Sequence, residues 1–269
     1  MAQPTKGASG RPQVFITGGA SGIGFELART YLQDGWGVTL LDIQPAEPAL
    51  ATLRSVVPDA AVRAFAMDVT QAETVRATFD EAALTARPDL VVHCAGICQA
   101  AAFEDITDAA YTRMITVNLL GSRNVALAAS AHLSQGGQFV LVASMAGLVG
   151  CYGYTGYCAS KYGVVGLAEV LRIEWAPRGI AVSVVCPPEV ETPMVVAERQ
   201  SRPAQTATLK LMAGTLPVDY AVSRIRAGID RRRFLIIPGV RARLLWGLNK
   251  LLPGALTRHL ADAMVRRSH

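Results

Sequence analysis

The sequence has few charged residues and lacks any long run of apolar ones. Asp, Glu, Lys and Arg make up 17% of the 269 residues, whereas 51% are hydrophobic. A composition this apolar supports a sizeable core and argues against disorder. No apolar stretch approaches the roughly 20 residues of a membrane-spanning helix, and residues 1–12 lack the apolar segment of a secretory signal. We therefore expect a cytoplasmic globular protein with a flexible tail over residues 1–12.

Cysteine is also scarce, and internal repeats and low-complexity tracts are absent. The five cysteines are odd in number and scattered, which does not match a disulfide framework and agrees with a reducing compartment. Cys94 and Cys98 lack a second pair of ligands, so we expect no metal site. The cysteines are Cys94, Cys98, Cys151, Cys158 and Cys186.

The positive net charge is concentrated at one end of the chain. The total is +5, but residues 221–269 contain eleven Arg or Lys and only two acidic residues. The first 220 residues therefore carry a net negative charge. Such an asymmetry marks a candidate partner surface in the C-terminal fifth.

Short apolar segments alternate with amphipathic ones along most of the chain. This alternation is typical of a parallel sheet covered by helices on both faces. We predict an α/β fold, a doubly wound parallel sheet (Rossmann fold), as a single catalytic domain over residues 13–239 with a basic amphipathic helical extension over residues 240–269. The expected strands are 14–16, 38–41, 61–66, 90–92, 138–142 and 181–185, and the expected helices are 21–34, 46–56, 71–86, 108–133 and 155–175.

A glycine-rich turn follows the first predicted strand and opens the first predicted helix. Gly18 allows the tight turn, Gly22 lets the backbone approach a pyrophosphate, and Gly24 lets the helix pack against the strand. Ser21 and Ile23 lie in the same turn. The free N–H groups at a helix start attract phosphate, so this context favours a dinucleotide site over a purely structural turn.

Two aspartates end the next two predicted strands. Asp42 lies eighteen residues after Gly24, where a carboxylate can accept hydrogen bonds from the adenosine ribose and would repel a 2′-phosphate. No basic residue adjoins it, so NAD(H) is preferred over NADP(H); the alternative is that Asp42 only caps a turn. Asp68 either binds the adenine amino group or caps the helix that begins near Thr70, and both readings stay open.

A tyrosine and a lysine four residues apart begin the helix predicted over residues 155–175. Residues at this spacing share a helix face, so Tyr157 and Lys161 can point into one pocket. A nearby ammonium and a positive nicotinamide ring favour the phenolate and lower the tyrosine pKa. Ser144, at the end of the preceding strand, can hydrogen-bond a substrate oxygen. Together the three form a coherent polar site.

These motifs, in this order, resemble the short-chain dehydrogenase/reductase family. The resemblance runs from about Val14 to Met194, and more loosely to Gly239. The matching residues are Thr17, Gly18, Gly22, Gly24, Asp68, Val69, Ala95, Gly96, Asn118, Ser144, Tyr157, Lys161, Pro187, Thr192 and Met194.

The resemblance implies a role for each catalytic residue. Tyr157 would be the acid–base, and Lys161 would lower its pKa and hold the cofactor ribose. Ser144 would polarise the carbonyl, and Asn118 would anchor a water relay to Lys161. The implied cofactor-binding set is Gly18, Ser21, Gly22, Ile23, Gly24, Asp42, Asp68, Val69, Cys94, Ala95, Gly96, Tyr157, Lys161, Pro187, Val190 and Thr192, with Thr192 on the nicotinamide amide.

Two stretches depart from the family pattern. His93-Cys94-Ala95-Gly96 replaces the usual Asn-Asn-Ala-Gly, which alters the support of the central strand. Pro188 replaces the usual glycine after Pro187, which changes the loop beside the nicotinamide.

Three segments are similar to the 3-ketodihydrosphingosine reductase branch of the family: residues 153–157, 186–193 and 202–206. The similarity implies a long-chain 3-keto lipid substrate, although that branch normally favours NADPH and has a basic residue near the position of Asp42. A 3-oxoacyl thioester reductase and a dehydrogenase of a steroid, sugar or small alcohol are the alternatives. A non-catalytic nucleotide-binding regulator on the same fold is a further class, against which the intact Ser144, Tyr157 and Lys161 argue.

The C-terminal segment predicts a basic amphipathic helix over residues 240–252. Three roles stay open for it: contact with a membrane surface, docking of an acidic carrier protein, or packing on its own domain as the lip of the substrate pocket. The resemblance also implies a homodimer or homotetramer through helices 108–133 and 155–175, and we expect no nucleic-acid partner. The apolar face of the segment holds Leu244, Leu245, Trp246, Leu248, Leu251 and Leu252, flanked by Arg241, Arg243 and Lys250.

Overall fold

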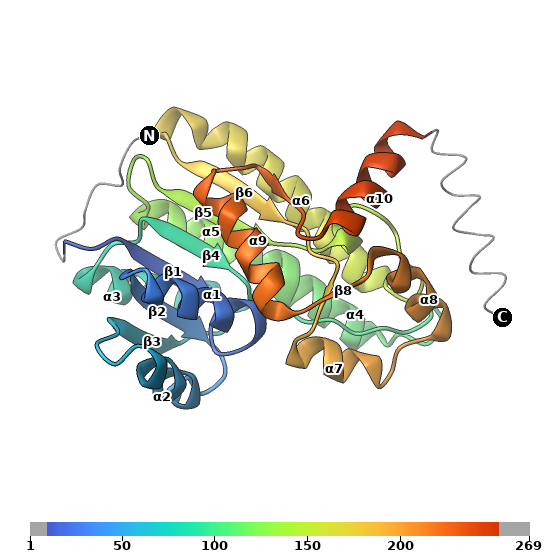
Figure 1. Cartoon of the computed structure of the whole chain (residues 1–269), viewed down its shortest axis with the longest axis horizontal. Coiled ribbons are helices and arrows are strands. Elements are labelled where there is room, and N and C mark those ends of the chain that lie inside the picture. Colours follow the sequence, from blue (N-terminus) through green and yellow to red (C-terminus); the bar gives the residue numbers. More distant parts are fainter. Residues whose placement is uncertain (1–9, 253–269) are drawn as a thin grey trace.

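A seven-stranded, entirely parallel sheet organises residues 10–252, the part of the chain that the computed structural model describes (Figure 1). The strand order is β3-β2-β1-β4-β5-β6-β9, and every neighbouring pair is parallel. The order reverses between β1 and β4, which is where ligands bind in open α/β sheets. The strands are β1 (Gln13–Thr17), β2 (Gly37–Asp42), β3 (Val62–Ala66), β4 (Leu90–His93), β5 (Gln138–Val142), β6 (Ala181–Val185) and β9 (Leu235–Ile236).

Helices cover both faces of this sheet and enclose two hydrophobic cores. One core packs the sheet against α3, α5 and α6, and the other packs it against α1, α2 and α9. The central strands are buried on both sides, which explains their continuous apolar sequences. The helices are α1 (Gly22–Gln33), α2 (Glu47–Val56), α3 (Ala72–Thr85), α4 (Asp108–Ile115), α5 (Gly121–His132), α6 (Thr155–Glu174) and α9 (Val218–Asp230).

The predicted fold class is confirmed, and the predicted strands and helices up to residue 185 lie within a few residues of the observed ones. One refinement concerns the helix predicted over residues 108–133. It is divided into α4 and α5 by a π-helical turn, Thr116–Leu120. Such turns insert an extra residue into a helix and often occur at functional sites.

The hydrophobic pattern predicts no helix or strand between β6 and the C-terminal segment that begins at residue 240. This part of the chain contains α7 (Pro193–Arg199) and α8 (Ala204–Ala213), bracketed by a small parallel pair, β7 (Glu189–Val190) and β8 (Thr215–Leu216). Strands of two residues carry no readable alternation. Figure 1 shows α7 and α8 at one end of the sheet, and α10 (Val240–Leu251) packs beside α8.

Helix α10 packs one side against the domain and exposes the other. Ala242 is fully buried in the core, and Trp246 packs against it. Leu244 and Leu251 are 62% and 84% exposed. The remainder of the predicted extension, from residue 253 onward, lies outside the described residues. Within residues 10–252 no helix is both long enough and apolar enough to cross a membrane.

Candidate active site

A cavity of about 650 Å³ lies at the carboxyl ends of the strands. It extends from the glycine turn after β1 to α8 and α10, and its volume is within the range of ordinary ligand pockets. Every candidate site residue from the sequence lines it except Asn118, which lies just behind the wall. The residues brought together are Gly18, Ser21, Gly22, Ile23, Gly24, Asp42, Asp68, Val69, Cys94, Ala95, Gly96, Ser144, Tyr157, Lys161, Pro187, Val190 and Thr192.

The glycine turn leaves no room for side chains. Gly18 has a φ of +64°, and a Cβ there would lie 2.7 Å from the Ala95 backbone nitrogen. A Cβ on Gly24 would lie 2.2 Å from the Gly18 carbonyl oxygen. Helix α1 starts directly at this turn, and the Ser21 side chain makes no capping hydrogen bond. The first N–H groups of α1 therefore remain available to an anion, which fits the pyrophosphate of a dinucleotide.

His93 supports this turn from the neighbouring strand. Its Nδ1 lies 2.7 Å from Thr17 Oγ1, which also accepts a hydrogen bond of 3.3 Å from the Ala95 backbone N–H. Burial lowers the pKa of His93 to about 3, so the imidazole is neutral and its Nδ1 can accept the Thr17 proton. Thus His93, a departure from the family pattern, still ties the end of β4 to the end of β1.

Asp42 caps turns, as one of the two interpretations of the sequence holds, and its side chain also lies at the cavity. One carboxylate oxygen accepts a hydrogen bond from the Ala20 N–H and the other from the Gln44 N–H, each at 2.9 Å. The side chain thus caps two turns, and it also lines the cavity. Each carboxylate oxygen has a second lone pair, so capping does not prevent contact with a ribose.

Asp68 is likewise divided between a cap and the cavity. Its Oδ1 accepts hydrogen bonds from the Thr70 N–H at 2.9 Å and from the Thr70 hydroxyl at 2.8 Å. Both bonds use the same oxygen. Asp68 also lines the cavity, where Oδ2 remains for an adenine amino group.

Ser144, Tyr157 and Lys161 converge from β5 and α6. Ser144 follows β5 and accepts a hydrogen bond from the Ala146 N–H at 3.1 Å, which leaves its own proton free to donate. Lys161 is only 5% exposed; its Nζ donates to the Val142 carbonyl at 3.0 Å and lies 5.7 Å from the Tyr157 ring centre. The four-residue spacing of Tyr157 and Lys161 therefore predicted correctly that their side chains lie close together.

Burial governs the protonation of these groups. Burial raises the pKa of Tyr157, and a hydrogen bond with Ser144 opposes this rise. Burial lowers the pKa of Lys161 to about 8. The protein groups alone thus keep Tyr157 a phenol, and the lowering expected from the sequence depends on the positive nicotinamide ring as well.

Asn118 sits in the π-helical turn and is fully buried. Its Oδ1 accepts from the Ile97 N–H at 2.8 Å, and its Nδ2 donates to the Ile97 carbonyl at 2.9 Å and to Ser160 Oγ at 3.0 Å. A Cβ added to Gly96 would lie 3.1 Å from Asn118 Oδ1 and 3.3 Å from Lys161 Nζ. Asn118 and Lys161 thus border the same glycine.

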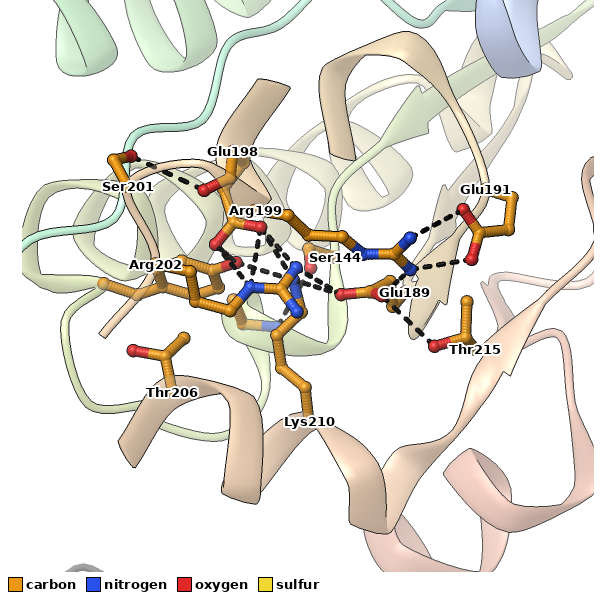
Figure 2. A network of polar contacts seen from close by, with 12 residues as sticks. Ser144, Glu189, Glu191, Glu198, Arg199, Ser201, Arg202, Thr206, Lys210 and Thr215 are labelled. Atoms are coloured by element: carbon orange, nitrogen blue, oxygen red, sulfur yellow. Dashed lines mark hydrogen bonds and ion pairs between the residues drawn. The ribbon is translucent and has the colours of Figure 1, made fainter. Parts of the chain in front are cut away.

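One group of charged residues in the wall was missed by sequence reasoning. Glu189, Glu198 and Lys210 line the cavity, and Tyr154 does so beside Tyr157. We call Glu189, Glu198, Arg199, Arg202 and Lys210 the roof cluster; Figure 2 shows their ion pairs. The four-residue spacing of Glu198 and Arg202 was a local signal for one pair. The other partners come from separate segments.

Comparison with known proteins now identifies the family. The model of the short chain dehydrogenase family matches residues 12–203. The chain belongs to the short-chain dehydrogenase family. A solved structure agrees with this assignment. The short-chain dehydrogenase from Sphingobium yanoikuyae in complex with NADPH superposes with a TM-score of 0.74 at 27% identity, and the match covers 93% of this chain and 96% of that one.

The relatives within the family differ in their named substrates. The 3-ketodihydrosphingosine reductase of Bos taurus is 33% identical over 201 residues, which cover 72% of this chain but only 60% of that protein. The D-threitol dehydrogenase of Mycolicibacterium smegmatis is 36% identical over 181 residues, covering 66% of this chain and 69% of the relative. A family member from Burkholderia phymatum in complex with NAD, 23% identical with a TM-score of 0.77 and covering 89% and 93% of the two chains, shares the fold.

The buried Lys161 makes a pH-dependent prediction. Its pKa rises from about 8 in the folded chain toward about 10.4 on unfolding, so the unfolded state binds more protons between these values and stability rises with pH there. The free energy of unfolding of the wild type, relative to Lys161→Met, should rise by on the order of 1 kcal/mol per pH unit in this window. Urea unfolding near both limits measures it. The exposed Lys250, changed to Met, is the control; equal slopes for all three proteins would contradict the prediction.

Proposed function

We propose that the protein is an NAD(H)-dependent oxidoreductase that interconverts a ketone and a secondary alcohol. The observation that carries the proposal is that Ser144, Tyr157 and Lys161 line one cavity together with the glycine turn. A nucleotide held at the turn and a carbonyl at the polar triad would therefore occupy one continuous space. The family membership supports the same class of reaction.

Each polar group has a distinct task in this proposal. The Tyr157 hydroxyl gives its proton to the carbonyl oxygen during reduction and takes it back during oxidation. The Ser144 hydroxyl, whose oxygen is held by Ala146, donates a hydrogen bond to the same oxygen. Lys161 would hold the nicotinamide ribose, and Asn118 would anchor a water relay to Lys161. A nicotinamide nucleotide, when bound, supplies or accepts the hydride.

The apolar end of the cavity supports a lipid-like 3-keto or 3-hydroxy substrate. Apolar side chains from α7, α8, α10 and the residue after α10 line much of the cavity, beside the charged Glu198 and Lys210, and they suit an aliphatic chain. Four 3-ketodihydrosphingosine or 3-dehydrosphinganine reductases are among the relatives, at 30–33% identity. The apolar lining residues are Met194, Val195, Leu209, Met212, Leu245, Leu248 and Leu252.

A panel of carbonyls of increasing chain length tests the function. Catalytic efficiency should rise with the length of the aliphatic chain, because each buried methylene contributes about 0.8 kcal/mol. Tyr157→Phe should reduce turnover by roughly 10²–10⁴-fold while leaving cofactor binding unchanged. Preference for a polyol, as the threitol dehydrogenase relative would predict, refutes the lipid assignment. Normal turnover by Tyr157→Phe refutes the role of the tyrosine.

The choice of nucleotide follows from Asp42. Its carboxylate lines the cavity and is held by two backbone N–H groups, so it cannot swing away from a 2′-phosphate. We predict a higher kcat/KM with NADH than with NADPH. Asp42→Asn should relax this preference by roughly 10-fold or more, since it removes the repulsion and keeps an oxygen acceptor for one of the caps. A wild-type preference for NADPH would overturn this assignment.

We further propose that the extension beginning at residue 240 contacts a membrane surface peripherally. The inward side of α10 forms the lip of the pocket, as one of the sequence alternatives holds, through Leu245 and Asn249. Its outward side exposes Leu244 and Leu251 beside exposed basic residues. This combination suits an anionic bilayer from which a lipid could enter the cavity. The carrier-protein alternative has no comparable support in the apolar exposure.

Co-sedimentation with vesicles tests the membrane contact without disturbing the pocket. The double variant Leu244→Glu and Leu251→Glu changes two exposed side chains that do not line the cavity. We expect the wild type to sediment with vesicles of anionic phospholipid at low salt, and the variant to remain in solution. Leu84→Glu, an equally exposed leucine on α3, serves as the control. Wild-type protein that ignores the vesicles would refute the proposal.

We also propose a homodimer or homotetramer through α5 and α6. These helices expose Leu127, Val170 and Ile173, which are 44%, 50% and 63% accessible in the single chain. An apolar surface of this kind on neighbouring helices suits a subunit contact. Light scattering gives the mass directly, and a monomer at micromolar concentration would refute the proposal.

A further inference from the structure

The roof cluster joins three separate parts of the chain above the catalytic tyrosine. Glu189 comes from β7, Glu198 and Arg202 from α7 and the turn after it, and Lys210 from α8. Arg202 binds both carboxylates: its guanidinium lies 2.5 Å from Glu189 and pairs with Glu198. Lys210 Nζ lies 2.6 Å from Glu189. Figure 2 shows the two arginines lying between the carboxylates and Lys210 reaching toward them from α8.

The two carboxylates of the cluster are buried, and each is paired with basic side chains. The side chains of Glu198 and Glu189 are 1% and 3% exposed. Burial by itself raises the pKa of Glu189, but hydrogen bonds from Lys210 and Arg199 outweigh burial and lower this pKa to about 2. Removing one partner from a buried pair leaves an uncompensated charge, so the members of the cluster hold each other in fixed positions.

Tyr154 connects this cluster to the active site. Its hydroxyl donates to Glu198 Oε1 at 2.8 Å and accepts from Lys210 Nζ at 2.7 Å. Its ring meets the ring of Tyr157 edge-on, with centres 5.3 Å apart. Tyr154 is buried, three residues before Tyr157. The roof therefore holds one end of this side chain while the other end packs on the proposed catalytic ring.

We propose that Tyr154 is a positioning residue, which fixes the ring of Tyr157 through its bonds to Glu198 and Lys210. This inference rests on the proposed function, since it assigns Tyr154 to the same reaction. A ring that only filled space would not need a hydroxyl enclosed between an ammonium and a carboxylate. The arrangement makes the orientation of Tyr157 depend on the roof being in place over the cavity.

The first test separates orientation from substrate binding. Tyr154→Phe keeps the ring and removes the hydroxyl, so kcat should fall roughly 10- to 100-fold, the cost of a slightly misplaced catalytic group, with KM changed less than about twofold. Tyr31→Phe is the matched control, because Tyr31 is also buried and its hydroxyl has no hydrogen-bond partner within residues 10–252. An unchanged kcat, or an effect on KM alone, would overturn the proposal.

The second test does not depend on turnover. The protein carries seven tyrosines, which can be labelled as 3-fluorotyrosine for ¹⁹F NMR, and the Tyr157 signal is the one missing from Tyr157→Phe. This signal should shift or broaden in Tyr154→Phe and in Lys210→Met, but not in Tyr31→Phe. An unshifted signal in both folded variants would overturn the positioning role. If the wild type reduces no carbonyl, the proposed function fails, and the NMR result still decides whether the roof sets the Tyr157 ring.

Discussion

The buried ammonium of Lys161 is the constraint on which the site depends. A lysine that is 5% exposed needs a fixed acceptor, and the Val142 carbonyl at the end of β5 provides it. A Cβ on Gly96 would make tight contacts with both Lys161 Nζ and Asn118 Oδ1, at 3.3 and 3.1 Å. The end of β5, the loop after β4 and the middle of the long helix are thus all arranged around one positive charge, beside which Tyr157 lies.

The π-helical turn is the local adjustment that lets the long helix take part. Asn118 lies in the π-helical turn Thr116–Leu120, and its side-chain amide bonds both backbone groups of Ile97, as a neighbouring strand would. Its Oδ1 accepts from the Ile97 N–H, and its Nδ2 donates to the Ile97 carbonyl. The long helix is thus hydrogen-bonded to the loop after β4 through Asn118.

The fold and the part of the site at the strand ends and on α6 were predictable because their signals are local. A buried parallel strand is a continuous apolar run, and the residue that ends it necessarily reaches the carboxyl edge, which located Asp42, Asp68 and Ser144. The spacing of Tyr157 and Lys161 needed only helix geometry. The roof cluster gave no such signal, since the bond from Tyr154 to Glu198 spans 44 residues and β7 and β8 are two residues long.

Helix α10 shows a different reason for incomplete prediction. Apolar residues occupy most of its circumference, so the sequence alone could not tell which leucines face inward. In the structure the inward face includes Ala242 and Leu245, and adjacent Leu244 points to solvent. Periodicity locates a helix well, but the face that packs depends on the shape of the neighbouring cavity.

The small pairing of β7 with β8 has a consequence for how such a protein can diversify. Glu189 pairs with Thr215 and Val190 with Leu216. Residues 191–214, an excursion that contains α7 and α8, therefore begin and end side by side. Loop-closure entropy grows only slowly with length. An excursion of another length or sequence could therefore be accommodated between the same two anchors without altering the sheet, whereas one that lacked Glu198 or Lys210 would also release the Tyr154 hydroxyl beside Tyr157.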